Sequence, residues 1–167
     1  MKFGKGLRNV LVTVIVGVSV LSCVPPSESK ESPVKTDVEK LSQLIHLPQG
    51  VNVVQWEVLP QGTVGGLGPN DWELLAIIEI PNGDTLRSLI KSSPISETNE
   101  VMAFPHNFVR GWFPQELVML WAEKSPGQKV LTVMPRNPAF FLKSPLLNGF
   151  FVPFGSKGQI FLYLYTQ

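Results

Sequence analysis

The chain has 167 residues, and its 14 Lys and Arg nearly balance its 13 Asp and Glu, giving a formal net charge of +1 at pH 7. This balance excludes the strongly basic face of a typical nucleic-acid-binding protein, so no nucleic-acid partner is expected. A single cysteine excludes an internal disulfide. A hydrophobic content of 44% is enough for a packed core, and the length suits one domain with an N-terminal extension.

The N-terminal 23 residues have the organisation of a bacterial export signal. A basic start with Lys2, Lys5 and Arg8 precedes an apolar run that is shorter than the roughly 20 residues of a membrane-spanning helix. The run ends in Val20-Leu21-Ser22-Cys23, which resembles the lipobox at which bacterial lipoprotein precursors are cut and lipidated. The resemblance implies diacylglycerol on the Cys23 thiol and an acyl chain, such as palmitate, on its freed amine. The alternatives are an ordinary signal peptide cut elsewhere, or an uncleaved anchor with a buried cysteine.

This resemblance divides the chain into three parts. Residues 1–22 would be the signal peptide, residues 23–36 the lipidated cysteine with a flexible tether rich in Pro, Ser and charge, and residues 37–167 one folded domain. The resemblance places the protein in the bacterial cell envelope. Because Val24 rather than Asp follows the cysteine, it implies the outer membrane in a two-membrane cell. In a single-membrane cell it implies the outer face of that membrane.

Capping and alternation predict the first elements of the domain. Thr36-Asp37-Val38-Glu39 has the form of a capping box, with Thr36 at the N-cap, and predicts a short helix over 38–46. Alternating apolar residues predict a strand over 51–59. Gln55 and Glu57 would lie on its solvent-exposed face.

The next stretch predicts a second strand and a second helix. Residues 72–80 are apolar at nearly every position, which is typical of a strand in the middle of a sheet. Asn82 or Asp84 would cap the helix that follows. The glycine-rich Gly62–Asp71 segment that precedes the strand does not open a helix, so it is interpreted as a surface loop rather than a phosphate-binding loop. The alternative is a shaped binding loop, which would form one contact surface with His106–Trp112.

The remaining pattern completes an α+β fold. The spacing of Phe113, Leu117, Leu120 and Trp121 predicts one face of a helix, which would end at Ser125-Pro126-Gly127. A hairpin is expected between 150–154 and 159–165. Shorter strands are expected over 101–104, 130–134 and 140–143. The fold class is therefore α+β, with a mainly antiparallel sheet of about five to seven strands and two or three short helices packed on it.

Two irregular stretches carry the candidate binding residues. Asp71 and Trp72 end the glycine-rich loop, and His106, Arg110 and Trp112 lie in a segment without periodicity. Aromatic and charged groups in irregular segments often belong to binding sites. The alternative is that both tryptophans belong to the core and that the histidine and arginine are solvated.

No catalytic or metal-binding motif can be recognised in the sequence, so no cofactor, metal ligand or catalytic residue is predicted. His46 and His106 are sixty positions apart, and Cys23 is assigned to lipid. The predicted function is a noncatalytic binding or accessory lipoprotein, attached to the membrane by its lipid, that binds another envelope protein or a small ligand. The alternatives are an immunity-type or inhibitor protein, or a tethered envelope hydrolase with acid/base carboxylates drawn from Asp71, Glu73, Glu79 and Glu116.

Overall fold

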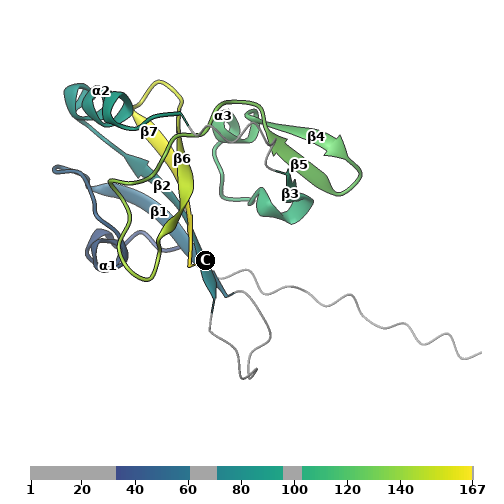
Figure 1. Cartoon of the computed structure of the whole chain (residues 1–167), viewed down its shortest axis with the longest axis horizontal. Helices are drawn as coiled ribbons and strands as arrows, with labels where there is room; N and C mark the ends of the chain where they lie inside the picture. Colours follow the sequence, from purple (N-terminus) through teal and green to yellow (C-terminus); the bar gives the residue numbers. More distant parts are fainter. Residues whose placement is uncertain (1–32, 61–70, 96–102, 167) are drawn as a thin grey trace, which may run out of the picture. The chain divides into compact units, whose positions relative to one another are not determined.

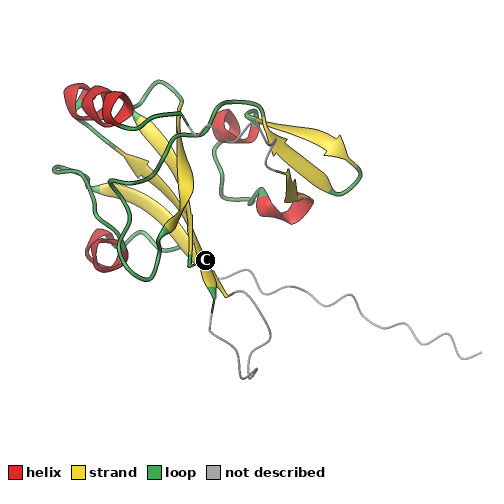
Figure 2. Cartoon of the chain, viewed as in Figure 1, coloured by secondary structure: helices red, strands yellow, loops and turns green. Residues whose placement is uncertain are grey.

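The computed structural model describes residues 33–60, 71–95 and 103–166, all within one compact unit, Glu31–Gln167. These residues form an α+β fold of seven antiparallel strands in two sheets with three α-helices, which confirms the predicted fold class (Figures 1 and 2). The helices are α1 (Val38–Leu44), α2 (Gly83–Ser92) and α3 (Gln115–Val118), with a short 3₁₀ helix η1 (His106–Phe108). The strands are β1 (Val53–Pro60), β2 (Trp72–Glu79), β3 (Ala103–Pro105), β4 (Trp121–Ser125), β5 (Gln128–Leu131), β6 (Asn148–Phe154) and β7 (Gln159–Tyr165).

The large sheet has the strand order β1-β2-β7-β6. Strand β2 lies between β1 and β7, which confirms that it is a central strand. Strands β6 and β7 form the predicted hairpin, with Phe154 opposite Gln159 at its closed end. Pro153 lies in β6, an edge strand, where the missing backbone N–H is best tolerated.

Both faces of the large sheet are covered by other parts of the fold. Successive side chains of β2 point to opposite faces, so this strand contributes to a core on each side. Leu74, Ala76 and Ile78 pack in a first core that also includes side chains of α1 and α2. Leu75 and Ile77 pack in a second core with residues of η1, α3 and the small sheet. Figure 1 shows the two longer helices on one side of the large sheet and the small sheet with α3 on the other.

The residues before α1 extend the large sheet. Lys35 N donates a hydrogen bond to Trp56 O (2.7 Å), and Trp56 N donates one to Lys35 O (2.9 Å). The Lys35 Nζ lies 4.7 Å from the centroid of the Trp56 ring. Residues 33–37, which we call the N-terminal strap, therefore lie along the outer edge of β1. The last residues of the predicted tether belong to this strap.

Helix α1 begins at Val38, as predicted, but its N-cap is not Thr36. The side chain of Asp37, rather than that of Thr36, caps the helix, because Asp37 Oδ1 accepts a hydrogen bond from Lys40 N at 3.0 Å. This hydrogen bond is the main reason that the pKa of the Asp37 carboxyl is lowered. The helix ends at Leu44, and the exposed His46 that follows donates its backbone N–H to Phe141 O (3.1 Å).

The small sheet has the strand order β3-β5-β4 and corrects the prediction for residues 113–125. The expected helix is a single turn, α3, and Trp121 begins β4 instead of lying on a helical face. Strands β4 and β5 form a hairpin whose turn is Pro126-Gly127. Gly127 has a φ of 81°, a conformation that glycine adopts without steric cost.

Residues 140–143, predicted as a strand, form a turn instead. Phe141 N donates a hydrogen bond to Pro138 O (2.7 Å), which closes the turn. Phe141 is fully buried in the first core, while Phe140 is 46% exposed. The strand predicted over 130–134 ends at Leu131.

Candidate functional site

Glu57 is the most deeply buried charged side chain among the residues that the structure describes. It was expected on the solvent-exposed face of β1, but its exposed fraction is 1%. Its Oε1 accepts a hydrogen bond from Trp112 Nε1 (3.1 Å) and lies 2.9 Å from Arg110 Nε. The segment between η1 and α3 therefore covers this face of β1 and supplies both partners of the carboxylate.

Arg110 is held at this position by both ends of its guanidinium group. Its side chain is 14% exposed. The Nε–H is not aligned on Glu57 Oε1, so the contact is an ion pair rather than a well-formed hydrogen bond. Nη1 donates a hydrogen bond to Asn107 O (2.8 Å). The positive charge of the guanidinium thus compensates the negative charge of the buried Glu57 carboxylate. Its hydrogen bond to Asn107 O also stabilises the conformation of the irregular segment.

A second carboxylate lies on the same face of the large sheet, one strand further in. Tyr163 on β7 donates its hydroxyl to Glu73 Oε1 on β2 (2.7 Å). Burial raises the pKa of the Tyr163 phenol, and the hydrogen bond to Glu73 and its negative charge raise it further. At the same end of the sheet, Thr166 Oγ1 donates to Asp71 Oδ1 (3.2 Å) and accepts from Trp72 N (3.3 Å).

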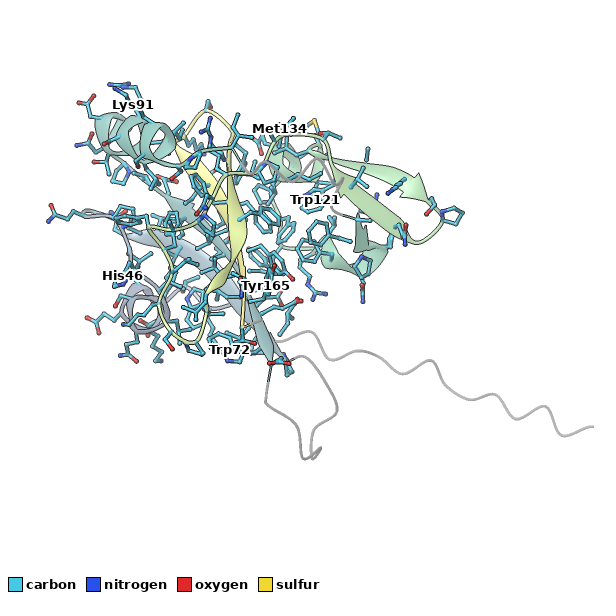
Figure 3. All side chains as sticks on the ribbon, viewed as in Figure 1. His46, Trp72, Lys91, Trp121, Met134 and Tyr165 are labelled. Atoms are coloured by element: carbon cyan, nitrogen blue, oxygen red, sulfur yellow. The ribbon has the colours of Figure 1, made fainter. Side chains whose placement is uncertain are left out.

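The structure brings together two of the five candidate binding residues. Arg110 and Trp112 meet at Glu57, and both belong to the second-core side of the large sheet. Trp72 packs against the first core, on the opposite face, near the end of the sheet where Figure 3 also labels Tyr165. Asp71 is half-buried just before β2, and His106 is exposed on η1. These five residues therefore do not form one surface.

Other candidate residues lie outside the described part of the chain. They are Cys23 and residues 62–70 of the glycine-rich loop. The lipidation site and the loop that would complete a composite binding surface with 106–112 stay predictions.

Exposed apolar side chains gather where α3 meets the segment after β5. Leu120 O accepts hydrogen bonds from both Thr132 N (2.8 Å) and Thr132 Oγ1 (2.9 Å), which holds the adjoining Met119 and Val133 on neighbouring stretches of chain. Met119 is 65% exposed and Met134 is 67% exposed. Met134 follows Val133 in the segment after β5. We call Met119, Val133 and Met134 the methionine patch.

Comparison with known protein families, characterised proteins and solved structures found no match to this chain. Within residues 33–60, 71–95 and 103–166, no cluster of His, Cys, Asp and Glu could hold a metal ion. In the same residues, no helix is long and apolar enough to cross a bilayer.

Proposed function

We propose that the protein is a lipoprotein of the bacterial envelope, held at the membrane by lipid on Cys23, whose domain binds another envelope protein without catalysis. Its support is the lipobox-like Val20-Leu21-Ser22-Cys23 together with the surface of the folded domain. The immunity-type or inhibitor reading is the same proposal with a toxin as the partner.

The methionine patch carries the proposal. Two methionines with most of their side chains in solvent lie beside a valine on neighbouring stretches of chain. Clustered exposed apolar groups mark protein interaction sites more often than singly scattered ones. Methionine suits such a site, because its unbranched, polarizable side chain adapts to the partner's surface.

Three of the four carboxylates named for a tethered hydrolase do not favour that alternative. A general acid or base needs a carboxyl group that reaches substrate. Glu73 is bound by the Tyr163 hydroxyl, and Asp71 by the Thr166 hydroxyl. Glu79 is six residues from Glu73 along β2, about 20 Å away at the usual rise of a strand.

Site-specific crosslinking in cells tests the proposal. A photoreactive amino acid replaces Met134 (67% exposed) in one variant and Leu147 (55% exposed), which is not in the patch, in a matched control. We expect one abundant protein adduct from position 134 and none from position 147. No adduct at position 134, or the same adducts at both positions, would contradict a binding role for this patch.

Membrane attachment has a separate test. Cys23→Ser removes the thiol that would carry diacylglycerol, so we expect the variant to be released from the membrane or to stay as an unprocessed precursor. Fractionation and mass measurement distinguish these outcomes. A variant that stays in the membrane fraction at the mass of the processed protein would show that Cys23 is not the anchor.

A further inference from the structure

We propose that a cleft beside α2 binds a neutral saccharide. The cleft has a volume of about 420 Å³, within the range of small-molecule sites. One wall is Phe140, in the turn before the fully buried Phe141, and the other is α2. The inference extends the proposed function by adding a second ligand class. It rests on that function only for the expectation that envelope glycans are within reach.

The aromatic wall of the cleft is fixed in place although it is exposed. Phe140 is 46% exposed, yet its ring makes an edge-to-face contact with Phe141 (centroids 5.2 Å apart, planes at 86°). The hydrogen bond from Phe141 N to Pro138 O holds the turn that carries both rings. A large apolar side chain that is exposed but held in one position loses little conformational entropy when a ligand binds to it.

The opposite wall offers hydroxyl groups in a row. Thr85, Ser88 and Ser92 line the cleft at intervals of three and four residues, which places them on one face of α2. Leu89, buried between them, forms an apolar floor. Ser92 Oγ donates to Leu89 O (3.1 Å), so the hydroxyl oxygen still has lone pairs to accept a further hydrogen bond.

The charge of the lining favours a neutral ligand. Among the described lining residues, Asp84 is the only ionisable one, and it already forms an ion pair with Arg87. The cleft therefore offers no cation to bind a phosphate or carboxylate. A purely apolar ligand would cover the three hydroxyl groups without giving them partners, which costs free energy.

A sugar ring matches both walls at once. The C–H groups on one side of a pyranose carry partial positive charge and are attracted to the negative face of an aromatic ring. Its hydroxyl groups both donate and accept, as do those of Thr85, Ser88 and Ser92. A neutral oligosaccharide is thus the ligand class that uses the aromatic ring, the apolar floor and the hydroxyl row together.

Saturation-transfer NMR on the full chain tests the proposal, with fully N-acetylated chitotriose and cellotriose as neutral probes and a detergent that has no sugar headgroup. Saturating the methyl resonances of the protein should transfer signal to the ring protons of at least one probe, and not in micelles without protein. We expect Phe140→Ala to weaken binding roughly tenfold, Phe140→Trp to retain it, and the exposed control Leu147→Ala to leave it unchanged.

Two results would overturn the saccharide site. One is no transfer to either probe from the wild-type protein. The other is transfer that Phe140→Ala leaves at full strength, which would place the sugar elsewhere. Thermal melts check that the variants are folded, which we expect because Phe140 is 46% exposed. Crosslinking at Met134 is independent of this cleft, so failure here and failure of the proposed function are distinguishable.

Discussion

Glu57 and Arg110 form an ion pair that is almost entirely enclosed by the fold, with 2.9 Å between Glu57 Oε1 and Arg110 Nε. The carboxylate comes from β1 and the guanidinium from the irregular segment after η1. Because Trp112 also donates to the same oxygen, three side chains fasten this segment to the large sheet. The pair therefore holds the segment after η1 against the large sheet, and its charges are largely shielded from solvent.

Breaking this pair should strongly destabilise the domain. Arg110→Met leaves the Glu57 charge buried without its counter-charge, which typically costs about 3–5 kcal/mol and corresponds here to a fall in melting temperature of roughly 10–20 °C. Circular dichroism during heating measures it.

A charge-free double variant is the control. In Glu57→Gln/Arg110→Met no charge is buried, and the glutamine carbonyl can still accept from Trp112 Nε1, so much of the lost stability should return. If Arg110→Met alone melted within about 2 °C of the wild type, the ion pair would contribute as little to the free energy of unfolding as a solvent-exposed pair does.

The local signals in the sequence were sufficient for the large sheet. Strands β2 and β7 are apolar on both faces, and this pattern predicted a central strand and a covered hairpin. In the small sheet, β3 and β5 overlap the strands expected over 101–104 and 130–134, but β4 was missed. Leu117, Leu120 and Trp121 have helical spacing, although Trp121 begins this strand. The ring of Trp121 packs against Phe104 and Phe161, and this packing favours the strand conformation. Such tertiary contacts cannot be recognised from the local periodicity of the sequence.

Replacing the Tyr163 hydroxyl should remove a buried charged hydrogen bond. Tyr163→Phe leaves Glu73 without its donor, so we expect a loss of about 1–2 kcal/mol at neutral pH, measured by chemical denaturation. A loss below about 0.3 kcal/mol would mean that water replaces the phenol at no cost.

The same tyrosine should make the native state sensitive to alkali. The pKa of Tyr163 is raised in the folded protein, so the unfolded chain loses this proton first, and stability falls as pH rises above about 10. Absorbance of the phenolate reports it: one of the two tyrosines of the chain should ionise only when the protein unfolds. Tyr163→Phe should abolish this delayed step. Its persistence in the variant would assign it to Tyr165.

Among the glycines that the structure describes, Gly149 is the one at which a side chain is least tolerable. It lies in β6 opposite Leu164 with a φ of 139°, and an added Cβ would collide with Tyr163 O and Leu164 Cα. We expect Gly149→Ala to cost at least about 3 kcal/mol, from backbone strain and overlap together. Gly111→Ala, where nothing lies within 4 Å, is the matched control and should change stability by less than about 0.5 kcal/mol. Equal stabilities of the two variants would contradict the close pairing of β6 and β7 at this point.

The candidate site was harder to predict from the sequence than the sheet. Arg110 and Trp112 were singled out because they lie in a nonperiodic segment, but their common partner Glu57 was assigned to solvent by strand alternation. Alternation states which side of a strand a residue occupies and not what covers that side. The covering segment lies more than fifty residues further along the chain, so only the tertiary structure reveals that Glu57 is enclosed.

The N-terminal strap should define where the folded domain begins. A protein that lacks residues 1–32 keeps every contact of Lys35, whereas one that lacks residues 1–36 loses two backbone hydrogen bonds and the cation held over the Trp56 ring. These contacts together are worth about 2–3 kcal/mol, so the shorter protein should melt roughly 5–15 °C lower than the longer one. Both should unfold cooperatively, because the core residues of α1 and β1 remain. Lys35→Ala in the longer protein isolates the side-chain contribution, which should be the smaller part of the difference. Equal melting temperatures for the two deletions would mean that the strap rests on β1 without stabilising it, and that the flexible tether extends to Thr36 as the composition of residues 24–36 predicted.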